Sequence, residues 1–272
     1  MNNDWKWYHS FGLLALIVVT CLVGWLIPAS QIQLTWLLSL VALTMFTMLT
    51  SHGITGRFWL GWLINEQYRM SLSRLQMFLW TVVVVSAFFT SVLTNIKAGH
   101  LENALDITIQ KELWIAMGIS TISLVGSPLI NSQKKRKKTN KKEAEKTLTR
   151  LGLLAEGANE VEKEVVTAKH YSGQLHRNEN PQDARLFDMV RGEETSNADV
   201  LDLTRLQNLF FTLILIGTYA VNLGSKLVAD AGEICKSPID KFPELGVSSI
   251  ALLAISHAGY LVGKAVDHQP EG

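Results

Sequence analysis

The side chains that could carry out acid–base or metal chemistry are scattered along this sequence. Its seven histidines lie far apart, and its two cysteines, Cys21 and Cys235, stand in distant parts of the chain. The sequence contains no glycine-rich phosphate loop, no HExxH motif and no Cys/His cluster with the spacing of metal ligands. We therefore expect a non-enzymatic protein with two free thiols and without a cofactor or a bound metal.

Five carboxylates gather between residues 188 and 202, and Arg191 is the only basic residue among them. Such a cluster could attract cations or bind a hard divalent metal. Its spacing matches no calcium-loop pattern, so we interpret it as a solvated acidic loop. The five residues are Asp188, Glu193, Glu194, Asp199 and Asp202.

Two similar tetrads each precede an uncharged stretch. Ser73-Arg74-Leu75-Gln76 is echoed by Thr204-Arg205-Leu206-Gln207. A hydroxyl residue followed three positions later by Gln is typical of a capping box at a helix start. Arg74 and Arg205 would then reach lipid phosphates at the headgroup level. The alternative is that these arginines surround the inner mouth of a pore.

Small and polar residues recur at helical spacing inside the uncharged stretches. Gly259 and Gly263 form a GxxxG pair, and Ala254 and Ala258 continue the series. Further upstream, Ser120 pairs in the same way with Ala116, and Ser123 with Ser127. These faces are predicted to pack against other helices. Ser256 and His257 are polar residues within a stretch of this kind, where polar groups are costly. We expect an interhelical hydrogen bond there, and a hydrated path is the alternative.

The elements that must position these residues are membrane helices. Although 48% of the 272 residues are apolar and only 18% are charged, the charges are segregated, and residues 7–56 contain none. A helix of about 20 apolar residues crosses a bilayer core, and lipid leaves helices as the usual way to satisfy the backbone. We predict an all-α bundle with six spans near residues 9–27, 34–50, 75–94, 113–130, 206–224 and 245–263. A short apolar run at 58–64, with Trp59 and Trp62, is expected to lie along the inner interface.

The distribution of basic residues predicts the orientation. With both termini in the cytoplasm, 20 of the 25 basic residues fall on the inner side and five on the outer side. The run that follows the fourth span is expected to orient the protein and to bind anionic headgroups, and nucleic-acid binding is the less favoured alternative. This run consists of Lys134, Lys135, Arg136, Lys137 and Lys138.

The tetrads belong to a longer internal similarity. Glu112-Leu113 is echoed by Glu244-Leu245, and Arg57-Phe58-Trp59 more faintly by Arg185-Leu186-Phe187. Both copies would begin on the inner side, which favours parallel rather than inverted repeats. We therefore predict an N-terminal hairpin at 1–50, a first repeat at 51–130, a cytoplasmic insert at 131–184 and a second repeat at 185–272. Apolar residues spaced by three and four predict one amphipathic helix over about 141–170 of the insert, packed within the monomer or against a second copy.

The segment Met70-Ser71-Leu72-Ser73-Arg74-Leu75-Gln76 with Trp80-Thr81, together with Gly192-Glu193-Glu194 and residues 202–212, resembles uncharacterised bacterial polytopic inner-membrane proteins. The resemblance covers the third to sixth spans and the segment before the fifth. It implies a bacterial inner membrane and a shared architecture, and it transfers neither an activity nor a functional residue.

These features favour a self-associating membrane protein, a homo-oligomer that acts as a channel-like or membrane-effector component. A scaffold that tethers a cytoplasmic partner through residues 131–205 is the second interpretation. A secondary transporter is the third, because parallel repeats do not fit the inverted-repeat transporter folds.

Overall fold

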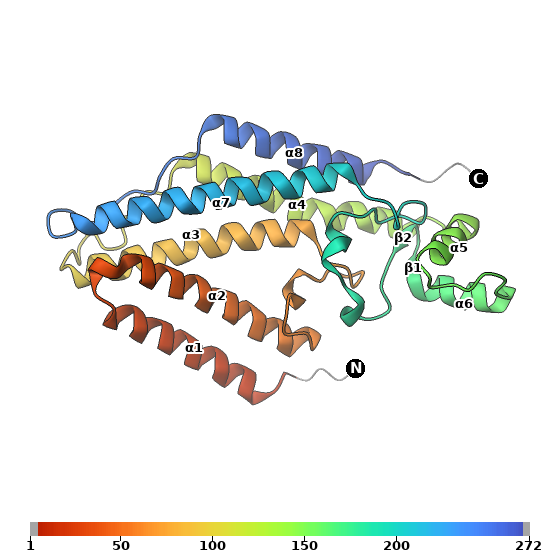
Figure 1. Ribbon diagram of the computed structural model, residues 1–272, viewed down its shortest axis with the longest axis horizontal. Coiled ribbons are helices and arrows are strands. Elements are labelled where there is room, and N and C mark those ends of the chain that lie inside the picture. The colour runs from red at the N-terminus through yellow and green to blue at the C-terminus, as the bar shows by residue number, and fades with distance from the viewer. Residues whose placement is uncertain (1–4, 269–272) are drawn as a thin grey trace. The chain divides into compact units, whose positions relative to one another are not determined.

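A computed structural model describes residues 5–268, and these residues are predominantly helical (Figure 1). The predicted all-α bundle is confirmed to the extent that six helices are long and apolar enough to cross a membrane. These are α1 (Trp7–Leu26), α2 (Ile32–Thr55), α3 (Leu72–Lys97), α4 (Lys111–Arg136), α7 (Leu203–Gly232) and α8 (Val247–Ala265). A 3₁₀ turn, η1 (Ala29–Gln31), leads into α2.

The described residues form two compact units. The first contains residues 5–62, Gln76–Gly118 and Thr212–Leu252, and the second contains Leu63–Leu75, Ile119–Phe211 and residues 253–268. The boundaries of these units fall inside α3, α4, α7 and α8, so they do not coincide with the predicted repeats. The internal duplication remains a prediction.

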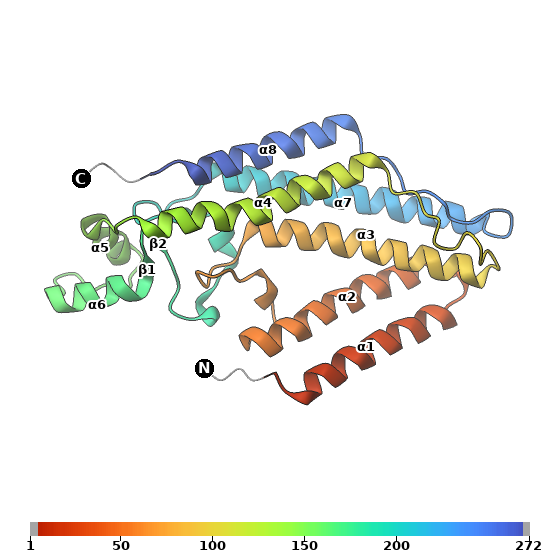
Figure 2. The ribbon, with the colours of Figure 1, turned by 180° about the vertical axis from the view of Figure 1, so that it is seen from behind.

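The first unit contains the hairpin of α1 and α2, which Figures 1 and 2 show as two neighbouring helices. The helices are separated where expected, because Ile27 adopts the extended backbone that a following proline favours. Helix α2 ends at Gly56, which takes the left-handed conformation of a C-cap. Lys97 at the end of α3 donates hydrogen bonds to the carbonyl groups of Gly24 and Ile27, 2.9 and 2.7 Å away, and so satisfies acceptors left open where α1 ends.

Polar side chains of α3 in the first unit are buried and joined to neighbouring segments. Trp36 Nε1 donates to Ser86 Oγ over 2.9 Å, and Thr90 donates to Ser39. The side-chain amide of Asn95 donates to the carbonyl of Ile239 and accepts from its backbone N–H. These groups hold helices together, because each hydroxyl or amide has a protein partner where lipid offers none.

The second unit contains residues 131–184, the predicted insert, whose helices depart from the prediction. The expected single helix over 141–170 is wrong: the structure has α5 (Lys141–Arg150) and α6 (Glu160–His170). Gly152 and Gly157 between them have φ of +71° and +82°, a conformation that ends a helix, and Asn159 starts the next one as its N-cap. The turn folds the insert onto itself around a core of Ala144, Leu148, Leu154 and Tyr171.

Short elements complete the second unit. Strands β1 (Tyr171–Ser172) and β2 (Leu175–His176) form a tight antiparallel hairpin next to α6 (Figure 2). The 3₁₀ turns η3 (Pro181–Asp183) and η4 (Leu186–Met189) follow before α7, and η2 (Gly61–Leu63) lies between α2 and α3. Of the predicted interfacial run, Trp59 is largely exposed, whereas Leu63 and Ile64 are buried.

Candidate functional site

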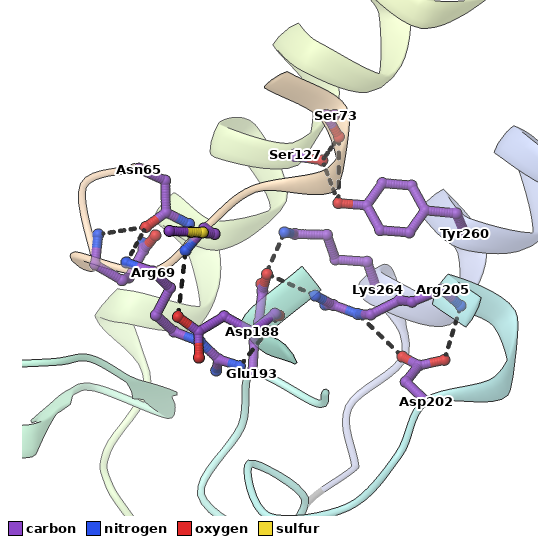
Figure 3. A network of polar contacts seen from close by, with 12 residues as sticks. Asn65, Arg69, Ser73, Ser127, Asp188, Glu193, Asp202, Arg205, Tyr260 and Lys264 are labelled. Atoms are coloured by element: carbon purple, nitrogen blue, oxygen red, sulfur yellow. Dashed lines mark hydrogen bonds and ion pairs between the residues drawn. The ribbon is translucent and has the colours of Figure 1, made fainter. Parts of the chain in front are cut away.

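A network of charged and hydroxyl side chains is buried in the second unit (Figure 3). At its centre, Arg205 Nη1 of α7 donates to Glu193 Oε1 over 2.8 Å. Lys264 Nζ of α8 lies 2.7 Å from Glu193 Oε2. The side chains of Lys264, Arg205 and Glu193 are only 4, 6 and 14% exposed, so two buried cations share the Glu193 carboxylate. We call the set formed by Ser73, Ser127, Lys134, Asp188, Glu193, Glu194, Asp202, Arg205, Tyr260 and Lys264 the polar network.

Asp202 joins the network to the start of α7. Its Oδ1 accepts hydrogen bonds from the backbone N–H groups of Thr204 and Arg205, 3.0 and 3.2 Å away, and its Oδ2 accepts from Arg205 Nε over 3.0 Å. Asp202 is therefore the capping residue of α7, and Thr204, which was predicted as the cap, is the second residue of the helix. A carboxylate is well suited to the positive end of a helix dipole.

The second acid of the Glu193-Glu194 pair is also buried. Lys134 of α4 donates to Glu194 and, over 2.7 Å, to the carbonyl of Val266. Glu194 further accepts from the backbone N–H of His268, and the His268 ring lies 2.9 Å from the same carboxylate. Adjacent acids thus bind different helices: Glu193 contacts α7 and α8, and Glu194 contacts α4 and the segment after α8.

A third carboxylate holds the segment before α3. Asp188 Oδ2 accepts from the backbone N–H of Arg185 over 2.8 Å and from that of Met70 over 3.4 Å. Asn65 Oδ1 accepts from the N–H of Arg69 and thereby shapes the turn that leads into α3. The interpretation of 188–202 as a solvated acidic loop is therefore wrong, because Asp188, Glu193 and Glu194 are buried structural anchors.

Hydroxyl groups connect the charges to the helices. Ser73 of α3 lies 3.3 Å from both Ser127 Oγ of α4 and Tyr260 Oη of α8, and the last two lie 3.1 Å apart. The Tyr260 ring faces Arg205 and Lys264 at 5.6 and 5.7 Å, within the range of cation–π attraction. The predicted cap residue Ser73 therefore contacts other helices.

The charges of the network depend on one another. Burial alone would raise the pKa of the Glu193 carboxyl, but Arg205 and Lys264 hold that pKa well below its usual range. Burial would likewise raise the pKa of Asp202, and hydrogen bonds from Thr204 and Arg205 lower it. Both carboxylates are therefore ionised at neutral pH and can compensate the charges of Arg205 and Lys264.

The space inside the network is too small for a substrate. The cavity between Glu193, Glu194, Arg205 and Lys264 measures about 10 Å³, which is roughly the room that one water molecule needs. Among residues 5–268, no group of three His, Cys, Asp or Glu side chains is arranged to hold a metal. The arrangement can hold helix ends and loops together, and it offers no place where a reacting molecule would sit.

The remaining tetrad residues lie in different surroundings. Gln76 donates to Thr212 over 2.7 Å within the first unit. Arg74 is partly exposed, whereas Arg205 is buried in the polar network. The two tetrads thus make different contacts despite their similar sequences, and no ring of arginines is formed within the described chain.

Of the five residues in the expected lipid-facing basic run, Lys134 is corrected, because its side chain is buried. Lys134 is buried on Glu194, Lys135 contacts Glu66 over 2.7 Å, and Lys137 contacts Asp267 over 2.7 Å. Arg136 and Lys138 are exposed. Three residues of the run thus form ion pairs with acids from different parts of the chain, and these pairs attach the end of α4 to neighbouring segments.

Small and polar residues of α4 and α8 are divided between packed and open positions. Ser120 and Ser123 are buried, and Ser123 Oγ lies 2.6 Å from His257 Nδ1, which matches the expected interhelical hydrogen bond. Ser256 is buried as well, and Gly263 lies against Thr204. Ala254 is partly buried, whereas Ala258 and Gly259 are exposed, and no atom lies within 4 Å of the position that a Cβ on Gly259 would take.

Sequence reasoning missed the partners of Glu193. The sequence does show the acid pair Glu193-Glu194 shortly before an uncharged stretch, and single basic residues, Arg205 and Lys264, at the ends of such stretches. Which base pairs with which acid depends on tertiary contacts that the sequence does not show.

Comparison of the chain with models of known families, with curated proteins and with solved structures finds no match.

Proposed function

We propose that this chain is a non-enzymatic multi-pass membrane scaffold that presents residues 131–205 to a cytoplasmic protein and couples that segment rigidly to its membrane helices. The single observation that carries the proposal is the buried pairing of Glu193 and Glu194 with basic side chains of α4, α7 and α8. A segment held by ion pairs at three helix ends cannot move independently of them, so a partner bound to the insert would sense or alter the positions of the helices.

The location is part of the same proposal. We place the chain in a bacterial inner membrane, as the resemblance of its sequence implies, and the excess of basic residues around the insert supports an orientation with both termini in the cytoplasm. Exposed Arg136 and Lys138 remain available to anionic headgroups, and nucleic acid is not among the partners that we propose.

The test compares the tagged full chain with a variant in which residues 141–170 are replaced by a flexible linker of equal length. Both are purified from cross-linked host membranes, and co-purifying proteins are quantified. The scaffold proposal expects one protein in near-stoichiometric amount that the linker variant loses. Equal recovery with both chains, or no stoichiometric protein with either, would contradict it. Near-UV circular dichroism checks that the linker variant keeps its folded membrane part.

A self-associating, channel-like component is the second candidate, with a parallel duplication underlying its architecture. The open surface at Ala258 and Gly259 supports it, because small residues on a lipid-facing helix allow close approach of another helix. Particle images in detergent with rotational symmetry and an axial cavity, together with ion flux in liposomes, would favour this candidate over the scaffold. Monomeric particles without flux would exclude it, and a secondary transporter ranks below both.

A further inference from the structure

Apolar side chains are held outward at the start of α7. Leu186 and Phe187 of η4 are 57 and 68% exposed, and Leu201 and Leu203 are 51 and 71% exposed. Large apolar side chains that gather on an exposed surface mark contacts with membranes or partners. The question is therefore which of these covers this patch.

The two segments that carry these side chains lie next to each other. Residues 190–192 pair with residues 200–202 as a short antiparallel ladder, in which Asp202 N–H donates to the Val190 carbonyl over 2.8 Å and Arg191 is bridged to Leu201. Turn η4 ends one residue before Val190. At the rise of a 3₁₀ helix of about 2 Å per residue, Leu186 is roughly 8 Å from Val190 along the chain. The patch is consequently continuous with the first residue of α7.

The outward direction of these side chains is fixed by the polar network. Asp188 of the same turn points inward and accepts from the backbone of Met70 and Arg185. On the other side of the ladder, Asp202 caps α7. Because Asp188 and Asp202 are anchored, the backbone next to them is held in place, and the neighbouring side chains of Leu186, Phe187, Leu201 and Leu203 stay exposed.

We propose that Leu186, Phe187, Leu201 and Leu203 form an interfacial anchor that inserts into the lipid leaflet entered by α7. The patch adjoins the lipid-facing surface of a membrane span, so the bilayer is the apolar phase next to it. Exposed Arg185 and half-exposed Arg191 flank the patch and complement anionic headgroups. Aromatic side chains such as Phe187 are suited to this depth, since amphipathic segments bury their apolar face about 5–10 Å into the boundary of headgroups and chains.

The faint sequence similarity between 57–59 and 185–187 agrees with the proposal. Trp59, which occupies the position equivalent to Phe187, is 67% exposed, against 68% for Phe187. Both segments precede a span by a similar distance in sequence and turn one large aromatic side chain outward. Phe187 thus matches Trp59 in exposure, and the run that contains Trp59 was predicted to lie at the membrane interface.

The test places an environment-sensitive fluorophore at single cysteines in the full chain. The exposed Cys21 and Cys235 are first replaced by Ser, and Phe187→Cys or Leu201→Cys is then introduced and labelled. Val161→Cys on α6 is the matched control, because Val161 is also an exposed apolar side chain but lies far along the insert. The labelled proteins are reconstituted into vesicles that contain anionic lipid and a nitroxide placed on the acyl chain either near the headgroup or near the terminal methyl.

The anchor predicts that the labels at 187 and 201 emit at shorter wavelength than the label at 161. It also predicts several-fold stronger quenching by the shallow nitroxide than at 161, and protection from aqueous iodide. Iodide quenching equal to that at 161 would overturn the proposal. Protection from both iodide and nitroxide lipid would also overturn it, since a protein, either a second copy or a partner, would then cover the patch. Neither result depends on a bound scaffold partner, so the failure of this anchor is distinguishable from the failure of the proposed function.

Discussion

Replacing Glu193 by Gln should destabilise the protein strongly, because two buried cations lose their shared counter-ion. Arg205 keeps Asp202, whose Oδ2 lies 3.0 Å from its Nε. Among residues 5–268, Lys264 keeps only the ring of Tyr260 at 5.7 Å. Removal of one partner from a buried ion pair costs about 3–5 kcal/mol, since a buried charge is left uncompensated. We expect Glu193→Gln to lower the free energy of unfolding by about this amount, mainly through Lys264.

The design includes a rescue. Lys264→Met removes the ammonium that Glu193→Gln would strand, so the double variant should lose less stability than the sum of the single variants. Contacting residues typically show coupling energies of about 0.5–3 kcal/mol. Unfolding is followed in mixed micelles as the mole fraction of a denaturing detergent rises. Glu143→Gln on α5 is the control, because the ion pair of Glu143 with Lys146 lies at the surface and its loss should leave the transition unchanged.

The pH dependence provides a second readout of the same network. The folded-state pKa of Glu193 is depressed, so its contribution to stability is fully present above the unfolded-state pKa of about 4.3 and is lost as the pH falls below it. Wild type should therefore lose stability on acidification more steeply than Glu193→Gln. The reasoning is refuted if Glu193→Gln costs less than about 1 kcal/mol, the upper value for an exposed pair, or if its effect and that of Lys264→Met are additive.

Three further substitutions test other contacts. Ser123→Ala removes the hydrogen bond to His257 and should cost about 0.6 to 1.7 kcal/mol in the same assay, the range found for interhelical hydrogen bonds; an unchanged transition would mean that the contact is not formed. Gly173→Ala places a methyl group 2.3 Å from the carbonyl oxygen of Lys135, at a residue whose φ is +62°. The resulting clash should loosen the β1–β2 turn, so limited proteolysis should cleave the insert faster than in wild type. Equal cleavage rates would contradict the tight turn. Asn95→Leu strands the backbone N–H of Ile239 and should cost about 1–3 kcal/mol; hydrogen exchange at Ile239 should rise, and undiminished protection there would contradict the assignment.

The membrane helices were predictable because their cause is local. An uncharged stretch of about 20 residues implies a helix long enough to span the bilayer core. Pro28 and Gly56 mark the ends of α1 and α2 through their own backbone preferences, which do not depend on tertiary contacts. The interhelical bond of His257 was expected for the same reason, since a polar group within an apolar stretch needs a partner.

The polar network was not predictable, because its partners are distant in sequence. Nothing near Glu193 indicates that its cations are Arg205 and Lys264, and nothing near Lys134 indicates that it leaves the lipid surface for Glu194. The capping box failed through competition: Asp202 supplies a stronger acceptor two residues before Thr204. The insert helix failed because apolar periodicity continues across Gly152 and Gly157, whose left-handed backbone breaks the helix.

The dependence of the buried acids on α8 also imposes an order on biosynthesis. Glu193 and Glu194 are made before Lys264 and His268, with which they pair, and Lys134 is made before Val266, whose carbonyl accepts from it. Until α8 has entered the membrane and its end has docked, Glu193 lacks one of its two cations and Lys134 lacks one of its two acceptors. A chain that stops before residue 264 therefore leaves charged groups exposed that the finished protein conceals. Membrane proteases could use this difference to separate incomplete chains from complete ones.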